Sequence, residues 1–320
     1  MNILLTGVAG FIGSHTAKAL ASLGHNIIGI DNFNDYYDPQ IKEDRIKVFL
    51  FGLDNLQVYR GDITDKVFLN KIFSENKIDI ICHLAAQAGV RYSLENPDTY
   101  IQTNILGTNN ILEMARKHGV SKMVYASSSS VYGGNTKMPF SELDDVSNSL
   151  ALYAVSKRTN ELQAKAYYNL FGINSVGLRF FTVYGPWGRP DMALFKFTEA
   201  ILNNQPIDVY NNGNHKRDFT YVDDIVSGIV AALNNCSGCE IYNLGNGSPT
   251  ALADFITLIE KRLNKSAQKN FLPMQAGDVA ETYADIGKAK NRLGFEPKTD
   301  PAAGIDKFIE WYLIYHKNKI

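Results

Sequence analysis

The first 180 residues alternate between short apolar runs and longer segments with helical spacing. The apolar runs predict strands over residues 2–6, 26–31, 57–62, 78–84, 122–127 and 174–179. Between them, the spacing predicts helices over 11–23 and near 64–74, 98–118 and 151–170. Continuous apolar strands joined by helices are typical of a parallel sheet that is covered on both faces. The pattern therefore predicts an α/β fold with a doubly wound, Rossmann-like parallel sheet.

After residue 181 the regular alternation stops. Short elements follow, with turn signals in YGPWGRPD and NNGNHKRD. A helix near 223–234 and a strand near 240–244 are expected to return to the main sheet, whereas 182–205 and 247–285 are expected to form a smaller, interleaved unit. We therefore expect a first domain over 1–181, joined by the segment near 220–246, and a mainly substrate-binding domain over 182–320.

Composition narrows the class of protein. The 320 residues are 45% hydrophobic and 20% charged, with a net charge of −1. This balance predicts neither a nucleic-acid partner nor an anionic membrane surface. The N-terminus lacks the pattern of a signal peptide, and no run of about 18 apolar residues predicts a membrane span. Three cysteines favour a reducing cytoplasm over a disulfide framework.

Two of the cysteines, Cys236 and Cys239, form a CxxC pair. A structural zinc site usually has four ligands, and the sequence offers no second CxxC or HxxxH motif. The pair also precedes a predicted strand and does not open a helix, unlike a thioredoxin-like redox motif. We expect a loop here and no metal site.

A glycine-rich turn joins the first strand to the first helix. The motif consists of Gly7, Gly10 and Gly13, with Phe11 and Ile12 at the start of the helix. Glycines permit a tight turn and a close approach of the backbone to a pyrophosphate, which the helix N-terminus favours electrostatically. A turn of glycines that merely packs against the sheet is the alternative. We interpret the motif as a dinucleotide-binding turn.

The ends of the next strands extend this predicted cofactor site. Asp31 ends the second strand, with Asn32 beside it, and an acid there binds ribose hydroxyls but repels a 2′-phosphate. This favours NAD over NADP. Asp62 and Ile63 could contact the adenine, although Asp62 could also be a helix N-cap. The fourth strand ends in small residues that allow the backbone to run beside the dinucleotide: Leu84, Ala85 and Ala86.

A second motif, YAVSK, supplies candidate chemistry. It places Tyr153 and Lys157 at positions i and i+4, on one face of a helix. A phenol with a pKa near 10 is a poor base at neutral pH. A nearby cation and a positively charged nicotinamide would stabilise the phenolate and lower that pKa.

The glycine turn and the YxxxK motif together resemble the extended short-chain dehydrogenase/reductase family over essentially the whole chain, and within it the NAD-dependent nucleotide-sugar 4-epimerases. The resemblance implies that Tyr153 is the general base and Lys157 its helper. It also implies that Ser128, in the SSSSVYG stretch, shares the proton of the sugar 4-hydroxyl.

The two serines that follow disfavour other reactions of the family. Dehydratases of this family carry Asp-Glu directly before VYG, and UDP-glucuronate decarboxylases typically carry Glu there. This chain has Ser129 and Ser130 at those positions. Because a hydroxyl does not exchange protons as a carboxyl does near neutral pH, elimination is disfavoured and reversible oxidation remains.

Several longer stretches resemble the UDP-glucuronate 4-epimerase subgroup. They are AAQAGVRYS, SSSSVYG, RFFTVYGPWGRPDM, KRDFTYVDD and, less closely, DNFNDYYD. The resemblance implies a UDP-sugar substrate and a redox-neutral exchange between UDP-glucuronate and UDP-galacturonate. The implied substrate contacts are Arg189 with the C5 carboxylate, Thr182 with the sugar, Arg217 with the diphosphate, Asp278 with the nucleotide ribose and Arg91 with an anion.

Alternatives remain at each of these positions and for the function. Arg189 could stabilise its loop, Arg217 could form a surface ion pair, and Asp278 could be a turn residue. The chain could instead epimerise UDP-glucose or UDP-N-acetylglucosamine, decarboxylate UDP-glucuronate, or serve as a non-catalytic NAD-sensing regulator. The apolar faces of 98–118 and 151–170 also predict a homodimer, although packing against the sheet explains much of the same pattern.

Overall fold

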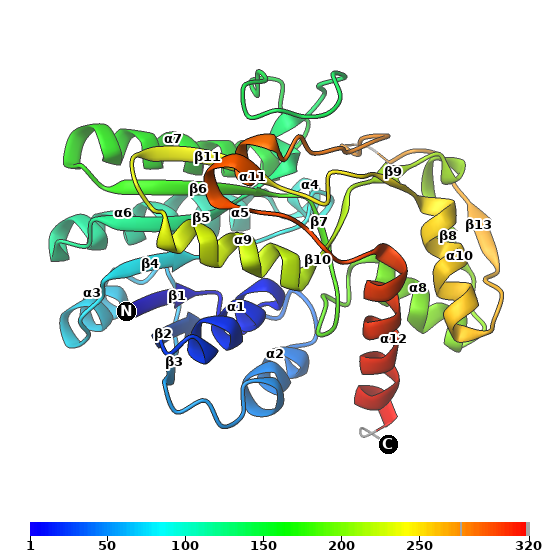
Figure 1. Ribbon diagram of the computed structural model, residues 1–320, viewed down its shortest axis with the longest axis horizontal. Coiled ribbons are helices and arrows are strands. Elements are labelled where there is room, and N and C mark those ends of the chain that lie inside the picture. Colours follow the sequence, from blue (N-terminus) through cyan, green and yellow to red (C-terminus); the bar gives the residue numbers. More distant parts are fainter. Residues whose placement is uncertain (276, 318–320) are drawn as a thin grey trace.

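The computed structural model describes residues 1–275 and 277–317, and its centre is a seven-stranded parallel sheet (Figure 1). The strand order is β11-β6-β5-β4-β1-β2-β3. The strands are β1 (Asn2–Thr6), β2 (Asn26–Asp31), β3 (Leu56–Arg60), β4 (Ile80–His83), β5 (Lys122–Ser128), β6 (Asn174–Phe180) and β11 (Cys239–Leu244). Each neighbouring pair runs parallel. The predicted doubly wound α/β fold is confirmed.

Burial on both faces explains why the strands are continuously apolar. In β1, Ile3 and Leu5 belong to one buried cluster, whereas Leu4 belongs to another, as the two-residue period of a strand requires. Helices cover each face. The first cluster includes side chains of α1 (Phe11–Ser22), α9 (Val222–Asn234) and α11 (Gly287–Leu293), and the second includes side chains of α3 (Lys66–Glu75), α6 (Thr108–His118) and α7 (Leu152–Phe171).

Two predicted elements differ from the structure in detail. The third strand ends at Arg60, so that Asp62 lies in the following loop. The helix expected near 98–118 consists of three consecutive segments, which are α5 (Pro97–Tyr100), the π-helical η2 (Ile101–Gly107) and α6. Hydrophobic periodicity carries no signal for the wider hydrogen-bonding pattern of a π-helix. The expected return of residues 240–244 to the sheet is observed, since β11 pairs with β6.

A further apolar cluster, separate from the two on the sheet faces, joins the elements that follow residue 181. At its centre, the rings of Phe219 and Phe255 stack with centroids 3.9 Å apart, and Phe308 is buried in the same cluster. The elements of this region are β7 (Thr182–Tyr184), α8 (Ala193–Leu202), β8 (Ile207–Val209), η4 (Tyr210–Gly213), β9 (Lys216–Arg217), β10 (Phe219–Tyr221), β12 (Thr250–Ala251), α10 (Leu252–Leu263), β13 (Lys269–Phe271) and α12 (Pro301–Lys317). Most of them lie beside the carboxyl ends of the sheet strands, to the right in Figure 1.

The order of the sheet creates a crevice between β1 and β4. From β1 the chain proceeds to β2 and β3 on one side, and from β4 to β5, β6 and β11 on the other. Ligands of doubly wound sheets bind at such a switch point, beyond the carboxyl ends of the strands. Gly7 lies there with φ of +76°, and a Cβ at this position would lie 2.8 Å from the backbone nitrogen of Ala85. Only glycine fits this approach of two backbones.

A buried arginine connects the loops around this crevice. Arg45 lies at the start of the π-helical η1 (Arg45–Phe49), directly after α2 (Gln40–Asp44), and is fully buried. Its Nη1 donates to the carbonyl oxygen of Ala9 at 2.9 Å. Its Nε and Nη2 donate to the carbonyl oxygen of Trp187 at 3.1 and 2.7 Å. Arg45 thus ties the glycine turn to the loop that carries Arg189.

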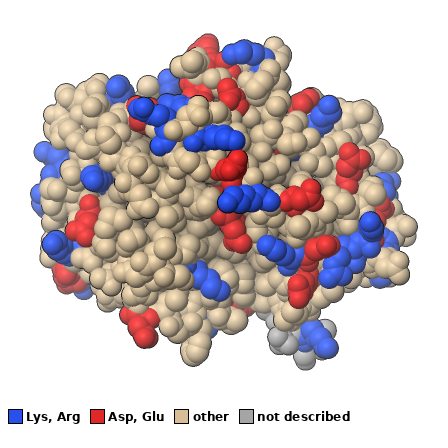
Figure 2. Space-filling model, viewed as in Figure 1, with Lys and Arg blue, Asp and Glu red and all other residues tan. Residues whose placement is uncertain are grey.

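Charged side chains of both signs are interspersed on the face that Figure 2 shows, in line with the net charge of −1. Among the helices of the described residues, none has the length and apolarity that crossing a membrane requires.

Replacing Arg45 with methionine is expected to destabilise the protein. The variant leaves the carbonyl groups of Ala9 and Trp187 buried without their donors, which corresponds to a loss of about 2–4 kcal/mol in the free energy of unfolding. Urea denaturation followed by circular dichroism measures this quantity. Arg262→Met is the matched control, because Arg262 is 42% exposed and pairs with exposed Asp306. It should change the free energy of unfolding by less than about 0.5 kcal/mol. Equal losses in the two variants would contradict the role of Arg45.

Candidate active site

A cavity of about 950 Å³ opens at the carboxyl edge of the sheet, between the glycine turn and the segments that follow residue 181. It brings together every residue that the sequence predicts for the site except Asp62. Its walls include Gly7, Gly10, Phe11, Ile12, Gly13, Asp31, Asn32, Ile63, Leu84, Ala85, Ala86, Arg91, Ser128, Ser129, Ser130, Tyr153, Lys157, Thr182, Arg189, Arg217 and Asp278.

The glycine turn presents a free helix N-terminus to this cavity. Gly10 is the N-cap of α1, has extended backbone angles and makes no side-chain cap. The first turn of α1 contains no acidic residue. The amide groups at its start are therefore available to an anion, as binding of a pyrophosphate requires.

Asp31 lies beside this turn at the end of β2. Its carboxylate accepts hydrogen bonds from the backbone nitrogens of Ala9 at 3.0 Å and Phe33 at 2.8 Å. Burial raises the pKa of Asp31, and these bonds and the nearby charge of Lys42 only partly oppose the shift. Lys42 itself lines the cavity and donates to the carbonyl oxygen of Asn34 at 2.6 Å. Sequence reasoning missed Lys42, because no motif or periodicity distinguishes it within the short helix α2.

Asp62 is not among the cavity residues, although its neighbours Gly61 and Ile63 are, and its contact with adenine stays a prediction. Its carboxylate accepts from the backbone nitrogen of Thr64 at 2.8 Å and from Nδ2 of Asn32 at 2.7 Å. It is not the N-cap of α3 either, because Asp65 takes that position and accepts from Val67 and Phe68. Asp62 shapes the turn after β3, and its neighbour Ile63 reaches the cavity.

All four serines of the run line the cavity, but the hydroxyl of the first one has a structural partner. Ser127 lines the wall, but its hydroxyl donates to Oε1 of buried Glu161 at 2.8 Å. Ser128 donates to Oγ of Ser130 at 3.1 Å and accepts from the backbone nitrogen of Ser130 at the same distance. Ser129 begins the short helix η3 (Ser129–Tyr132). This turn holds the hydroxyl groups at the end of β5, facing the start of α7.

Tyr153 and Lys157 both point into the cavity from the first two turns of α7, as the i, i+4 spacing predicts. Burial raises the pKa of Tyr153, while a hydrogen bond with Ser128 and the charge of Arg189 oppose this shift. Lys157 donates to the carbonyl oxygen of Ala126 at 2.9 Å, and burial lowers its pKa to about 8. Ser128, Tyr153 and Arg189 therefore act on one another electrostatically within one site.

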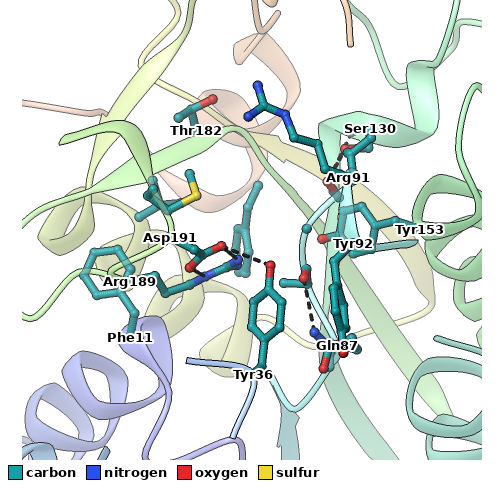
Figure 3. A pocket seen from close by; sticks show the side chains of 18 of the residues that line it. Phe11, Tyr36, Gln87, Arg91, Tyr92, Ser130, Tyr153, Thr182, Arg189 and Asp191 are labelled. Atoms are coloured by element: carbon teal, nitrogen blue, oxygen red, sulfur yellow. Dashed lines mark hydrogen bonds and ion pairs between the residues drawn. The ribbon is translucent and has the colours of Figure 1, made fainter. Parts of the chain in front are cut away.

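Arg189 faces Tyr153 across the cavity, and its guanidinium already has a partner (Figure 3). Nε donates to Oδ1 of Asp191 at 3.0 Å and Nη2 donates to Oδ2 at 2.5 Å. The hydroxyl of Tyr36 donates to the same Oδ2 at 3.2 Å. The sequence indicated Arg189, but Asp191 was missed, because nothing in RPD distinguishes a cavity acid from a loop acid.

A second arginine–carboxylate pair forms another part of the wall. Arg217 donates to Oδ1 of Asp278 at 2.8 Å and to the carbonyl oxygen of Ala280 at 3.0 Å. Burial lowers the pKa of Arg217, against the opposing charge of Asp278. Arg91 approaches Oδ2 of Asp278 at 3.9 Å. Arg217 thus forms an ion pair at the cavity wall, not on the outer surface. Thr182, at the start of β7, also reaches this cavity.

The CxxC pair lies outside this cavity. Cys236 follows α9 and is buried, with its sulfur 3.6 Å from the carbonyl oxygens of Met123 and Asn174. Cys239 opens β11. Over residues 1–275 and 277–317, no cluster of three or more His, Cys, Asp or Glu side chains has the arrangement of a metal site.

Comparisons with known proteins agree with this geometry. Residues 3–245 match the model of the NAD dependent epimerase/dehydratase family. The chain is 49% identical to Protein CapI of Staphylococcus aureus, over 99% of this chain and all of that one. It is 45% identical to UDP-glucuronate 4-epimerase 4 of Arabidopsis thaliana, over 99% of this chain and 76% of that one.

Among solved structures, the chain is similar to UDP-glucuronic acid 4-epimerase from Bacillus cereus, crystallised with UDP-glucuronic acid and NAD. The TM-score is 0.91 at 35% identity, over 98% of this chain and all of that one. The resemblance inferred from the sequence motifs is confirmed. The chain belongs to the NAD-dependent epimerase/dehydratase family, and it is an enzyme with NAD as its cofactor.

Proposed function

We propose that the protein interconverts UDP-glucuronate and UDP-galacturonate. The observation that carries this proposal is the presence of Ser128, Tyr153 and Arg189 in one cavity, next to a dinucleotide-binding turn. A guanidinium fork suits a carboxylate, because it offers parallel hydrogen bonds that a lysine does not. The relatives named as UDP-glucuronate 4-epimerases, at 35–45% identity, support the same substrate.

In this proposal the protein's own residues control the proton of the sugar 4-hydroxyl. Bound NAD supplies reversible hydride transfer at C4. Tyr153 accepts the hydroxyl proton and later returns it, and the Ser128 hydroxyl, which bonds to Tyr153, relays it. Lys157, held by the carbonyl of Ala126, supplies the positive charge that favours the phenolate. The 4-keto sugar turns over within the cavity, so that hydride returns to the opposite face.

The serines that line the cavity favour epimerisation over elimination. Ser129 and Ser130 lie where the resembling dehydratases and decarboxylases carry carboxyl groups, and both line the cavity. Their hydroxyl groups hydrogen-bond but do not exchange protons with a sugar as a carboxyl does.

We also propose that the region over 182–320 mainly binds the UDP-sugar. In this assignment Thr182 bonds the sugar, Arg217 contacts the diphosphate and Asp278 contacts the ribose, with Arg91 as a further anion contact. All four line the cavity. The region over 1–181, joined by the segment near 220–246, would then be the NAD-binding domain.

The second candidate is a 4-epimerase of a neutral UDP-sugar. The observation in its favour is the bidentate pair of Arg189 with Asp191, because this arginine already has a carboxylate partner without any substrate. Assays of the purified protein with UDP-glucuronate, UDP-glucose and UDP-N-acetylglucosamine, without added NAD, distinguish the two candidates. Turnover of a neutral sugar alone would favour the second.

Replacing Tyr153 with phenylalanine is expected to lower the rate of UDP-glucuronate epimerisation by about 10²–10⁴-fold, because the base is lost. Bound NAD, measured by absorbance after denaturation, should stay unchanged. Tyr168→Phe is the matched control on the same helix, since Tyr168 lies outside the cavity. Full activity of the Tyr153 variant would contradict the proposed role.

Arg189→Ala is expected to lower kcat/KM for UDP-glucuronate by about 10- to 100-fold, the loss typical of a hydrogen bond to a charged group. Product analysis should also reveal a UDP-pentose, because the 4-keto intermediate is a β-keto acid that loses CO2 when its carboxylate is not held. The control is Arg262→Ala, on the exposed face of α10. Wild-type kinetics without pentose in the Arg189 variant would refute the carboxylate contact.

We further propose that the protein forms a homodimer, as the apolar faces of 98–118 and 151–170 predict. We also propose that it is cytoplasmic, which its three cysteines favour. Ile101 and Leu106 of η2, and Val155 and Leu162 of α7, are between 36% and 54% exposed. Such side chains on neighbouring helices suit a contact between two copies of the chain.

Leu162→Glu is therefore expected to convert the dimer to a monomer, because the contact would bury an unpaired charge. Light scattering of the NAD-loaded protein measures the mass. Val67→Glu, at an 81% exposed position on α3, is the control and should leave the mass unchanged. A monomeric wild-type protein would show the prediction to be wrong.

A further inference from the structure

Asp191 occupies the face of Arg189 that a substrate carboxylate would use. The two hydrogen bonds from Nε and Nη2 end on the two oxygens of one carboxylate, which is the bidentate geometry proposed for the sugar. The side chains are 19% and 24% exposed, so both still open to the cavity. A guanidinium has five N–H donors, and only those of Arg189 that do not bond to Asp191 are left for a second anion.

Tyr36 fixes this carboxylate from the opposite loop. Its hydroxyl donates to Oδ2 of Asp191, and its ring lies 5.7 Å from the guanidinium carbon of Arg189 (Figure 3). Burial by itself raises the pKa of Asp191, but the charge of Arg189 and the hydrogen bonds from Arg189 and Tyr36 together outweigh it and bring the pKa below its usual value. The pair therefore stays ionised and has no net charge at neutral pH.

This arrangement has opposite consequences for charged and neutral sugars. A carboxylate that approaches Arg189 meets a guanidinium that Asp191 has already neutralised, and the two carboxylates repel each other. A neutral sugar does not compete for Arg189, so the arginine keeps Asp191 as its partner when the sugar binds. Burying a guanidinium without a partner would be strongly unfavourable, and this cost is avoided. Specificity is the difference between the binding free energies of the charged and the neutral sugar. Asp191 reduces that difference, because it weakens binding of the charged sugar and favours binding of the neutral one.

We propose that Asp191 sets the selectivity of the site between UDP-sugars with a carboxylate at C5 and UDP-sugars with a neutral group there. This rests on the function proposed above, and it assigns to Asp191 a role that neither the glycine turn nor the YxxxK motif implies. Asp191 keeps Arg189 oriented and neutralised, and in doing so it restrains the preference for uronates.

The test measures dissociation constants of the NAD-loaded protein for UDP-glucuronate and UDP-glucose by calorimetry. Asp191→Asn keeps the shape of the side chain and removes its charge. It should tighten binding of UDP-glucuronate by roughly tenfold and weaken binding of UDP-glucose. Asp35→Asn is the matched control, because Asp35 is exposed in the same loop as Tyr36 and outside the cavity wall. It should change neither constant.

A second variant keeps the proposal testable if the first does not fold. In Arg189→Ala combined with Asp191→Asn, no guanidinium remains to be left unpaired, so UDP-glucose should bind as tightly as it binds the wild-type protein. Weaker binding of UDP-glucuronate by Asp191→Asn, or equal changes for both sugars, would overturn the proposal. Failure of the proposed function gives a different result from failure of the Asp191 proposal. In that case the wild-type protein and Arg189→Ala would bind UDP-glucuronate equally.

Discussion

The geometry of the site depends on one buried guanidinium. Arg45 donates to backbone oxygens on both sides of the crevice, at Ala9 in the glycine turn and at Trp187 in the loop before Arg189. Trp187 has a φ of +60°, which is unfavourable for a bulky residue. The two hydrogen bonds to its carbonyl oxygen help to hold that conformation. The positions of the glycine turn and of the loop that carries Arg189 are therefore coupled through a side chain that does not line the cavity.

Burial and the neighbouring groups have opposite effects on the pKa of the Tyr153 phenol. Burial raises the pKa of Tyr153, and the hydrogen bond with Ser128 and the charge of Arg189 counteract this shift only in part. Lys157 is directed at the carbonyl of Ala126. In the function proposed above, an oxidised nicotinamide would add positive charge that favours the phenolate form of Tyr153.

Two arginines of the cavity share a further property, which is that each is paired with a carboxylate of the protein. Arg189 pairs with Asp191, and Arg217 pairs with Asp278. Pairing keeps these arginines oriented and avoids unpaired buried charges, at the expense of some attraction for an anion. If the substrate is a UDP-sugar, as proposed above, it is strongly anionic and meets two cations that are already largely neutralised. Under that proposal, selectivity depends on the partners of the arginines as much as on the arginines.

The sequence by itself determined the parallel sheet, the glycine turn and the placement of Tyr153 and Lys157 on one helix face. These follow from local rules, because strand burial, turn geometry and helical spacing involve residues that are close in the chain. The tertiary structure alone decided that Asp62 faces Asn32 and Thr64 instead of the cavity. It alone brought Tyr36 to Asp191 across 155 positions of sequence, and Arg45 to Trp187 across 142. Hydrogen bonds between loops leave no periodicity, so no pattern along the chain could have indicated them.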